Sequence, residues 1–466
     1  MKIFNLILFL LVSGMGWLVA QSPDENLKKY WNYRQRLEYF VSVGDQPGES
    51  CIAAQRNFMS GDKAVLRFGQ HITYFGEYMG VVATEYLLLK LENADVKSTL
   101  TELYYILEAY KRLDKCESKF PWNQKNDCLD GFAVRDDISA DFIKRSPDLN
   151  RGQNEKISFD SLRKTAPGKP GYVNRVCSPG CADCACNSST KLSELKKTNC
   201  VNQDDLCPLF TGLALVIKCL PDTLLTVIKN DGSKVKYQFC DTARMIMYLS
   251  VSYLSNEHKK YGSDSWQLYR PDSTAIDWRN GGVTKYFSSA FIKLLEKYVP
   301  EKNVSEKASC FYRFFWQFLQ IFPLPNNDNR SMTSHLAVVT DSWRFAGINT
   351  TCSGIRKQGM VDGWKPYYLL MWKFLNDKKR RFNPAKAEKH LDLAPFNGPY
   401  CYKQGEEIPG NKWSSSSRYW QSRKNQKNGS AFFMGNYNGT DFLLLYNLYH
   451  LNFREKLPNY TKFKSP

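Results

Sequence analysis

Apolar side chains recur every three or four positions over several long stretches of this chain, which is the spacing of an amphipathic helix. The first stretch follows "SPDE" at 22–25, where the serine can cap a helix, the proline suits its first position and the glutamate can reach back. A second stretch covers 69–92, and a third begins at another capping box, "TLTE" at 99–102. Further helical patterns cover 203–219, 238–256, 285–298, 307–321, 364–376 and 440–453. The chain is therefore expected to be built mainly from helices.

Strand signals are weak, and the best of them is "KVKYQF" at 234–239. Roughly ten to twelve helices with few strands have to bury their apolar stripes on one another. A solenoid would need a repeated sequence motif, and the chain contains none that we recognise. We therefore predict an all-α fold of the α/α-toroid type, a closed ring of helical hairpins, with an irregular helical bundle as the alternative. Residues 21–466 are expected to form a single large domain.

A long interruption separates the helical patterns at about 145–201. Pro, Gly, Lys and Asn dominate it, and it includes "CSPGCADCAC" at 177–186, with four cysteines in ten positions. A loop of this length within a compact domain is normally functional or disordered. We expect a surface insertion that disulfides hold in place, because its own hydrophobicity is too low to form a core.

The first twenty residues, "MKIFNLILFLLVSGMGWLVA", contain one charge, an apolar stretch and then small residues before a polar segment. This is the layout of a signal peptide. A membrane span would need about 18 or more unbroken apolar residues, and no other stretch of the chain is long and apolar enough. We therefore predict a secreted, extracellular protein without a membrane span.

The predicted export affects how the cysteines are interpreted. All fourteen follow residue 20, and an even number in an oxidising compartment favours disulfides. The cluster at 177–186 lacks both a second C-x-x-C pair and a neighbouring histidine, so a metal site and a redox role are only alternatives. A eukaryotic secretory route would also allow glycans on seven N-x-S/T sequons, at Asn187, Asn303, Asn329, Asn349, Asn428, Asn438 and Asn459.

The chain is strongly basic, with 64 Lys and Arg against 46 Asp and Glu and a formal net charge of +18. The basic residues are spread along the chain, and the densest runs are "KKRR" at 378–381 and "RKNQK" at 423–427. Such an excess steers a protein toward anionic polysaccharides, anionic membranes or cell-surface glycans. Nucleic acid is not expected as a partner outside the cell. Solubility without a specific partner is the alternative explanation of the charge.

Six segments resemble a family of exported, largely uncharacterised proteins of flavobacteria and their relatives, and together they span most of the chain in order. They read "YWNYRQRLEYFVSVGDQPGES", "YFGEYMGVVATEYLLLK", "LTELYYILEAYKRLD", "LDGFAVRDD", "NQDDLCPLFTGLALVIKCLPD" and "GNYNGTDFLLLYNLYHL". The resemblance implies export and an all-helical, toroid-like fold. It brings no known reaction, so it implies no catalytic residue. The many cysteines of this chain depart from the family.

Acidic residues gather in "LDGFAVRDD" at 129–137, which contains Asp130, Arg135, Asp136 and Asp137. Adjacent carboxylates with an arginine can form two acids of unequal pKa, as glycoside hydrolysis requires. The alternative is structural, since an aspartate can cap the next helix while the arginine pairs with a carboxylate to fix the turn.

Two further helix starts carry candidate residues. "VNQDDL" poses the same choice between catalysis and capping for Asp204, and it leaves Gln203 as a possible hydrogen-bond donor to a substrate. "GNYNGTDF" places Tyr437, Asn438 and Asp441 at the start of the last long helical pattern. Backbone N–H groups at such a start favour an anionic or hydroxyl-rich ligand.

Aromatic residues beside polar ones offer a surface for sugar rings, as in "NKWSSSSRYW" with Trp413 and Arg418, although many aromatic residues belong to the core. Gln70 and His71 begin a long helical pattern and could face the centre of a helical ring, unless the histidine is simply a core residue. The histidines form no zinc-binding motif, and nucleophile-elbow, Walker and dinucleotide motifs are missing from the sequence. We therefore expect neither a catalytic metal nor a cofactor.

These observations favour a secreted protein that engages an acidic or cell-surface glycan, with a hydrolase-like or lyase-like enzyme as one form of it. The alternative is a non-catalytic glycan-binding or surface-binding protein with a structural or toxin-like role. The helix starts at 130–137, 203–205 and 436–441 discriminate between the two. If they open on the same rim, their carboxylates and amides can meet and an enzyme is favoured; on opposite rims, capping explains each of them.

Overall fold

The structure is a computed structural model of the whole chain. It describes residues 22–41, 46–50, 52, 55–58, 64–67, 71–117, 129–133, 201, 203–256, 265–269, 275–276, 285–304, 307–321, 327–342, 365–379, 381–396, 398–401 and 435–464. The proposed signal peptide at 1–20 and the insertion at 145–201, apart from Val201, lie outside these residues.

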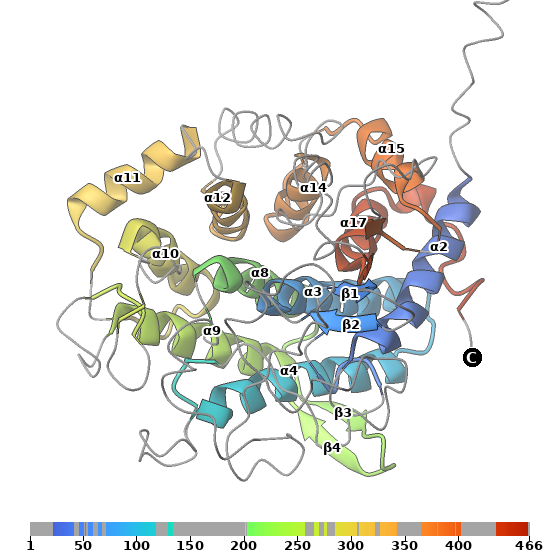
Figure 1. Cartoon of the computed structure of the whole chain (residues 1–466), viewed down its shortest axis with the longest axis horizontal. Coiled ribbons are helices and arrows are strands. Elements are labelled where there is room, and N and C mark those ends of the chain that lie inside the picture. The colour runs from blue at the N-terminus through green and yellow to red at the C-terminus, as the bar shows by residue number, and fades with distance from the viewer. Residues whose placement is uncertain are drawn as a thin grey trace, which may run out of the picture.

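The described part of the chain is mostly helical with few short strands, which confirms the all-α prediction (Figure 1). The capping box predicted at the first helix is present, because Ser22 Oγ accepts a hydrogen bond from Glu25 N at 3.2 Å and Ser22 N donates to Glu25 Oε2 at 3.0 Å. The longer helices are α2 (Pro23–Arg36), α3 (His71–Leu91), α4 (Lys97–Glu117), α8 (Gln203–Cys219), α9 (Phe239–Ser255), α10 (Ser288–Tyr298), α11 (Cys310–Ile321), α12 (Asn327–Val339), α14 (Lys365–Leu375), α15 (Ala385–Leu393) and α17 (Thr440–Asn452). Short 3₁₀ helices are η1 (Leu37–Phe40), η3 (Lys285–Phe287) and η5 (Arg454–Lys456).

Two small antiparallel sheets accompany the helices. One is the hairpin of β3 (Leu225–Ile228) and β4 (Lys234–Tyr237), which contains the strand signal seen in the sequence. The other has the order β2-β1-β6-β5 and was not predicted. It is formed by β1 (Gln55–Phe58), β2 (Ala64–Arg67), β5 (Tyr400–Cys401) and β6 (Gly435–Tyr437). Because β1 pairs with β6, this sheet joins the segment before α3 to the segment before α17.

The long helix α3 runs in the same direction as both of its main neighbours, α8 and α17. On the α8 side, Thr73 Oγ1 donates to Asp205 Oδ1 at 3.1 Å, so the first turns of the two helices meet. On the α17 side, Thr440 Oγ1 donates to Glu77 Oε2 at 2.8 Å, and Asn447 further along α17 reaches Thr84. The starts of α3, α8 and α17 therefore lie at the same end of the molecule.

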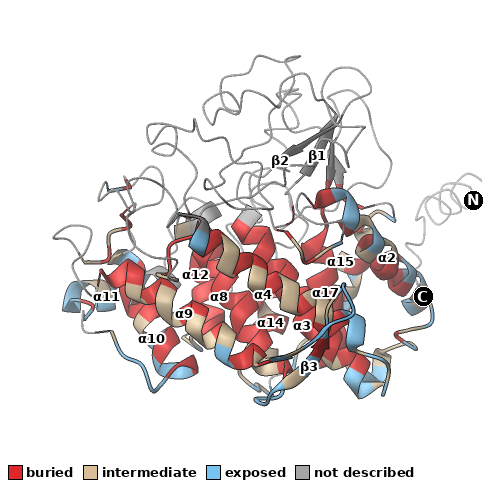
Figure 2. Ribbon diagram, turned by 90° about the horizontal axis from the view of Figure 1, so that it is seen from below, coloured by how far each residue is buried: buried red, intermediate tan, exposed pale blue. Residues whose placement is uncertain are grey.

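The contacts among five helices form a closed series that begins and ends at α3. Contacts join α3 to α8, α8 to α12, α12 to α14, α14 to α17 and α17 to α3. The helices α12 and α14 also run in one direction, because Ser331 meets Tyr368 near their starts while Asn376 donates to the carbonyl of Val338 near their ends. Residues 440–451 of α17 are buried on all sides, and Figure 2 shows the buried residues in red along α8 and α3 as well. The core thus lies among these helices.

Three cysteines whose side chains the structure describes, Cys219, Cys240 and Cys310, form no disulfide. Cys219 and Cys240 are buried thiols, and Cys310 is an exposed thiol. Burial raises the pKa of Cys219, and it raises the pKa of Cys240 to about 11, so both thiols stay protonated at neutral pH. The four cysteines at 177–186 lie outside the described residues, so the disulfide-held insertion stays a prediction.

Across the described ranges, no helix combines the length and apolar character that a membrane crossing requires.

Candidate functional site

The structure describes only part of the predicted site residues. Six of them lie outside the described ranges: Gln70, Arg135, Asp136, Asp137, Trp413 and Arg418. His71 begins α3 and Asp204 lies in the first turn of α8, but their side chains are not described. The described candidates are Asp130, Gln203, Tyr437, Asn438 and Asp441.

Buried carboxylates lie at the common end of α3, α8 and α17. Asp205 accepts a hydrogen bond from Thr73, and Glu77 accepts one from Thr440. Thr73 and Glu77 are one helical turn apart and therefore lie on the same face of α3. Asp205 and Glu77 are both buried. Asp205 belongs to the predicted helix start at 203–205, whereas Glu77 lies outside every segment that the sequence predicted for the site. The structure thus brings together acids from segments that are more than a hundred residues apart.

The start of α17 is shaped by a glycine and an asparagine. Gly439 has a φ of +80°, a left-handed conformation that suits glycine. Asn438 Oδ1 accepts hydrogen bonds from the backbone N–H and the hydroxyl of Thr440, both at 3.1 Å. Asp441 Oδ1 accepts from Phe442 N at 2.8 Å, and its side chain is buried. Asn438 therefore fixes the turn that leads into α17, whose N-cap residue is Gly439, and it also positions Thr440 beside Glu77.

A buried tyrosine of α14, Tyr367, is influenced by the charges of two of these acids. Burial raises the pKa of the Tyr367 phenol well above its ordinary value, and the negative charges of Glu77 and Asp441 raise it further. Two carboxylates from different helices thus act on one buried hydroxyl group. The Thr211 hydroxyl of α8 and Nδ1 of His335 from α12 lie 3.0 Å apart. Titratable side chains from α3, α12, α14 and α17 are therefore buried in the interior of this group of helices.

Asp130 belongs to a turn beside the same end. The carboxylate of Asp114, near the end of α4, accepts hydrogen bonds from the backbone N–H groups of Asp130 at 2.9 Å and Gly131 at 3.0 Å. Burial raises the pKa of Asp114, and the charge of Asp130 raises it further. The N–H of Val201, which shortly precedes α8, donates to the carbonyl of Ala133 at 3.2 Å. The sequence predicted three segments for the site, 130–137, 203–205 and 436–441. Their described parts therefore lie at one end of the molecule.

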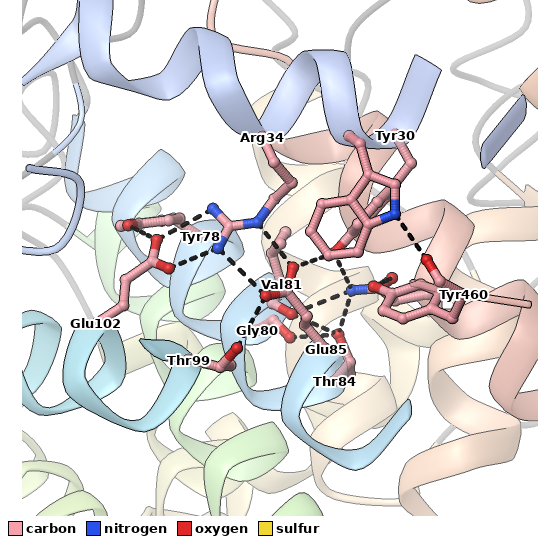
Figure 3. A network of polar contacts seen from close by, with 12 residues as sticks. Tyr30, Arg34, Tyr78, Gly80, Val81, Thr84, Glu85, Thr99, Glu102 and Tyr460 are labelled. Carbon is pink, nitrogen blue, oxygen red and sulfur yellow. Dashed lines mark hydrogen bonds and ion pairs between the residues drawn. The ribbon is translucent and has the colours of Figure 1, made fainter. Parts of the chain in front are cut away.

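The structure also contains a buried ionic network that was not predicted from the sequence (Figure 3). Arg34 of α2 lies between two glutamates: its Nε is 2.8 Å from Glu85 Oε2 of α3, and its Nη2 is 2.5 Å from Glu102 Oε2 of α4. Tyr30 and Thr99 donate to Glu85 at 2.6 and 3.1 Å, and the Tyr78 hydroxyl donates to Glu102. The network joins three helices through charged groups.

The ionic network around Arg34 has a structural role. Burial alone would raise the pKa of Glu85, but the charge and hydrogen bonds of Arg34, with the hydrogen bond from Tyr30, lower it overall. Because Glu85 accepts hydrogen bonds from Arg34, Tyr30 and Thr99, its carboxylate stays ionised and has little capacity left for a substrate. The network continues through Asn447, whose amide donates to Tyr30 at 3.1 Å, and so reaches α17.

A pocket of about 570 Å³ opens beside this network. It lies among α2, the first half of α4, the turn between β3 and β4, and the C-terminal segment. This volume lies in the range of small-molecule sites. Groups that can meet a ligand include the side chains of Arg34, Gln46, Lys97, Tyr105, Asn230 and Lys464.

Comparison of the chain with protein-family models, curated proteins and solved structures finds no match. Within the described residues, no group of three or more His, Cys, Asp and Glu side chains could hold a metal ion.

Proposed function

We propose that the protein is secreted and engages an acidic or cell-surface glycan, and that it acts on it as a hydrolase-like or lyase-like enzyme at the common end of α3, α8 and α17. One observation carries this proposal: carboxylates from three helices that run in one direction, Glu77, Asp205 and Asp441, gather at that end. This is the arrangement that favours an enzyme over separate helix caps.

The arrangement of the helices supports a toroid-like fold. Contacts lead from α3 through α8, α12, α14 and α17 back to α3, as expected for the inner ring of an α/α toroid. The helices α2, α4, α9 and α15 each pack on at least one of these five. In such a ring, the helix starts surround the centre of one rim, so a bound polymer could meet side chains from several helices at once.

The residue types suit acid–base chemistry. Glycoside hydrolysis needs one protonated and one ionised carboxyl group, and neighbouring carboxylates in a buried site move each other's pKa values apart. The negative charges of Glu77 and Asp441 both raise the pKa of the Tyr367 phenol, so the two carboxylates influence a common group. The net charge of +18 would draw an anionic polymer toward the molecule before it reaches these acids.

The test is an assay of the secreted full-length protein against uronate-containing and sulfated polysaccharides. Reducing ends report hydrolysis, and the ultraviolet absorbance of an unsaturated product reports a lyase. Glu77→Gln and Asp441→Asn are each expected to lower cleavage by about 100-fold or more if these groups act as acid or base. Asp241→Asn, in the first turn of α9 on the exposed surface, is the matched control and should cleave normally. Wild-type protein that cleaves none of these polymers would contradict the enzymatic proposal.

A non-catalytic glycan-binding role is the second candidate, and the pocket beside Arg34 favours it. The pocket combines two aromatic residues, amide groups and two lysines, which suits hydroxyl groups and negative charges of a sugar. Two of its three glutamates, Glu85 and Glu102, are engaged with Arg34, so they offer no acid–base pair. This role would be favoured if the protein binds a glycan without cleaving it. Lys97→Ala and Tyr105→Ala should then weaken binding, while Glu77→Gln should leave binding unchanged.

A further inference from the structure

Helix α11 exposes an unusual aromatic stripe. The side chains of Phe311 and Phe314 are 62% and 68% exposed, and Phe318 on the next turn is 42% exposed. Residues that are three, four or seven positions apart share one face of a helix, so these rings form a continuous stripe. Exposed clusters of large apolar residues mark interaction surfaces more often than isolated ones do.

The side of α11 that carries Trp316 packs on η3. Trp316 is completely buried, and its ring contacts Phe287 at a centroid distance of 6.2 Å. Tyr286 packs on Phe315 at 5.1 Å and on Tyr312 at 5.7 Å. The aromatic stripe is therefore presented by a helix that η3 and α10 support, rather than by a segment that could fold its rings inward.

The sequence around α11 is basic. Between residues 285 and 321 the sequence contains six Lys and Arg and three Glu, which gives a local net charge of +3. Arg313 is exposed on α11 itself, and Lys307 precedes it. Figure 1 shows α11 at the outer edge of the molecule, where it can approach a flat surface.

From this combination we propose that α11 docks on the surface of an anionic lipid bilayer, with Phe311 and Phe314 in the boundary between headgroups and acyl chains. An amphipathic helix with Phe on one face and basic residues around it is the usual peripheral membrane element. Charge complementarity favours an anionic bilayer over an uncharged protein groove as the occupant. The proposal does not depend on the glycan-directed function, since it uses neither the acids of α3 and α17 nor the pocket beside Arg34.

Flotation of the full chain with vesicles tests this proposal. Wild-type protein should float with phosphatidylcholine vesicles that contain phosphatidylserine, and much less with pure phosphatidylcholine or at high salt. The double substitution Phe311→Ser and Phe314→Ser should lower vesicle affinity by about tenfold or more, because two apolar side chains no longer enter the bilayer. Leu224→Ser and Phe396→Ser, at sites that are 63% and 52% exposed elsewhere, are matched controls and should bind as wild type does.

A second variant reports contact directly. Tryptophan fluorescence of Phe314→Trp should shift to shorter wavelengths on addition of anionic vesicles, while Phe396→Trp should not shift. Failure to bind anionic vesicles would overturn the proposal, as would equal binding by the double variant. Sedimentation that shows a dimer dissociated by the double substitution would assign the stripe to a second copy of the chain, and would also overturn it.

Discussion

The Nε atom of Arg34 lies 2.8 Å from Oε2 of Glu85, with only 10% and 2% of the two side chains exposed. This contact ties α2 to α3, and the second contact of Arg34 with Glu102 extends the tie to α4. Charged groups in such a place require one another, because each would be costly to bury alone.

Replacing Arg34 with methionine should destabilise the protein by about 3–5 kcal/mol, since it leaves two carboxylates buried without a counter-charge. The measurement is the free energy of unfolding from urea titration followed by circular dichroism. Arg244→Met is the matched control, because Arg244 also binds two carboxylates, Asp222 at 2.7 Å and Asp241 at 2.9 Å, but near the surface. Exposed ion pairs contribute about 0–1 kcal/mol, so the control should change little. Equal losses in the free energy of unfolding for the two substitutions would show that burial does not increase the contribution of the Arg34 ion pairs to stability.

Glycines set the spacing of α3 and α8 beside the candidate site. A Cβ atom added at Gly76 would lie 2.4 Å from the backbone carbonyl carbon of Pro208, whereas one added at Gly80 would meet the flexible end of Leu215 at 2.7 Å. Gly76→Ala should therefore destabilise the protein by about 2 kcal/mol or more, because two backbones must separate. Gly80→Ala is expected to cost clearly less, since a side chain can rotate away. Thermal unfolding of the two variants in parallel compares them, and a larger loss for Gly80→Ala would contradict the close approach at Gly76.

Local patterns in the sequence predict much of the helical fold. The apolar spacing and the serine–glutamate box place the first helix correctly, because both signals depend on neighbours within two turns. The strands β1 and β6 were missed, since each is short and their partners lie almost four hundred residues apart. The buried network had one visible signal, the charged Glu85 in the apolar run "GVVATEYLLL", but no local pattern identifies its partner Arg34.

The candidate site shows the same limit. Helix starts were recognised at Gln203 and near Asp441 from their cap-like residues, and the structure brings these starts to one end. The sequence could not show that Glu77, in the second turn of α3, would join them. That position depends on the directions of three helices, and helix direction is a property of the complete packing rather than of any single segment.

The last prediction concerns His450, which lies within α17 and is buried beside the rings of Tyr446 and Tyr449. Its Nδ1 makes no hydrogen bond to any described residue. Burial lowers the pKa of this histidine to about 3, because the surroundings offer nothing to stabilise a charged ring. The unfolded chain, in contrast, exposes a histidine with a pKa near its ordinary value of about 6.5.

Between those two pKa values the unfolded state binds one more proton than the folded state at this position. The contribution of neutral His450 to stability is therefore complete above about pH 6.5 and is lost as the pH falls, at about 1.4 kcal/mol for each pH unit. His450→Phe removes the titrating group while it keeps an aromatic ring in the core. Urea unfolding of both proteins at pH 7 and pH 5 should therefore show a decrease in stability that is about 2 kcal/mol larger for wild type. Equal decreases would mean that His450 binds a proton as readily in the folded protein as in the unfolded chain, and thus that burial does not lower its pKa.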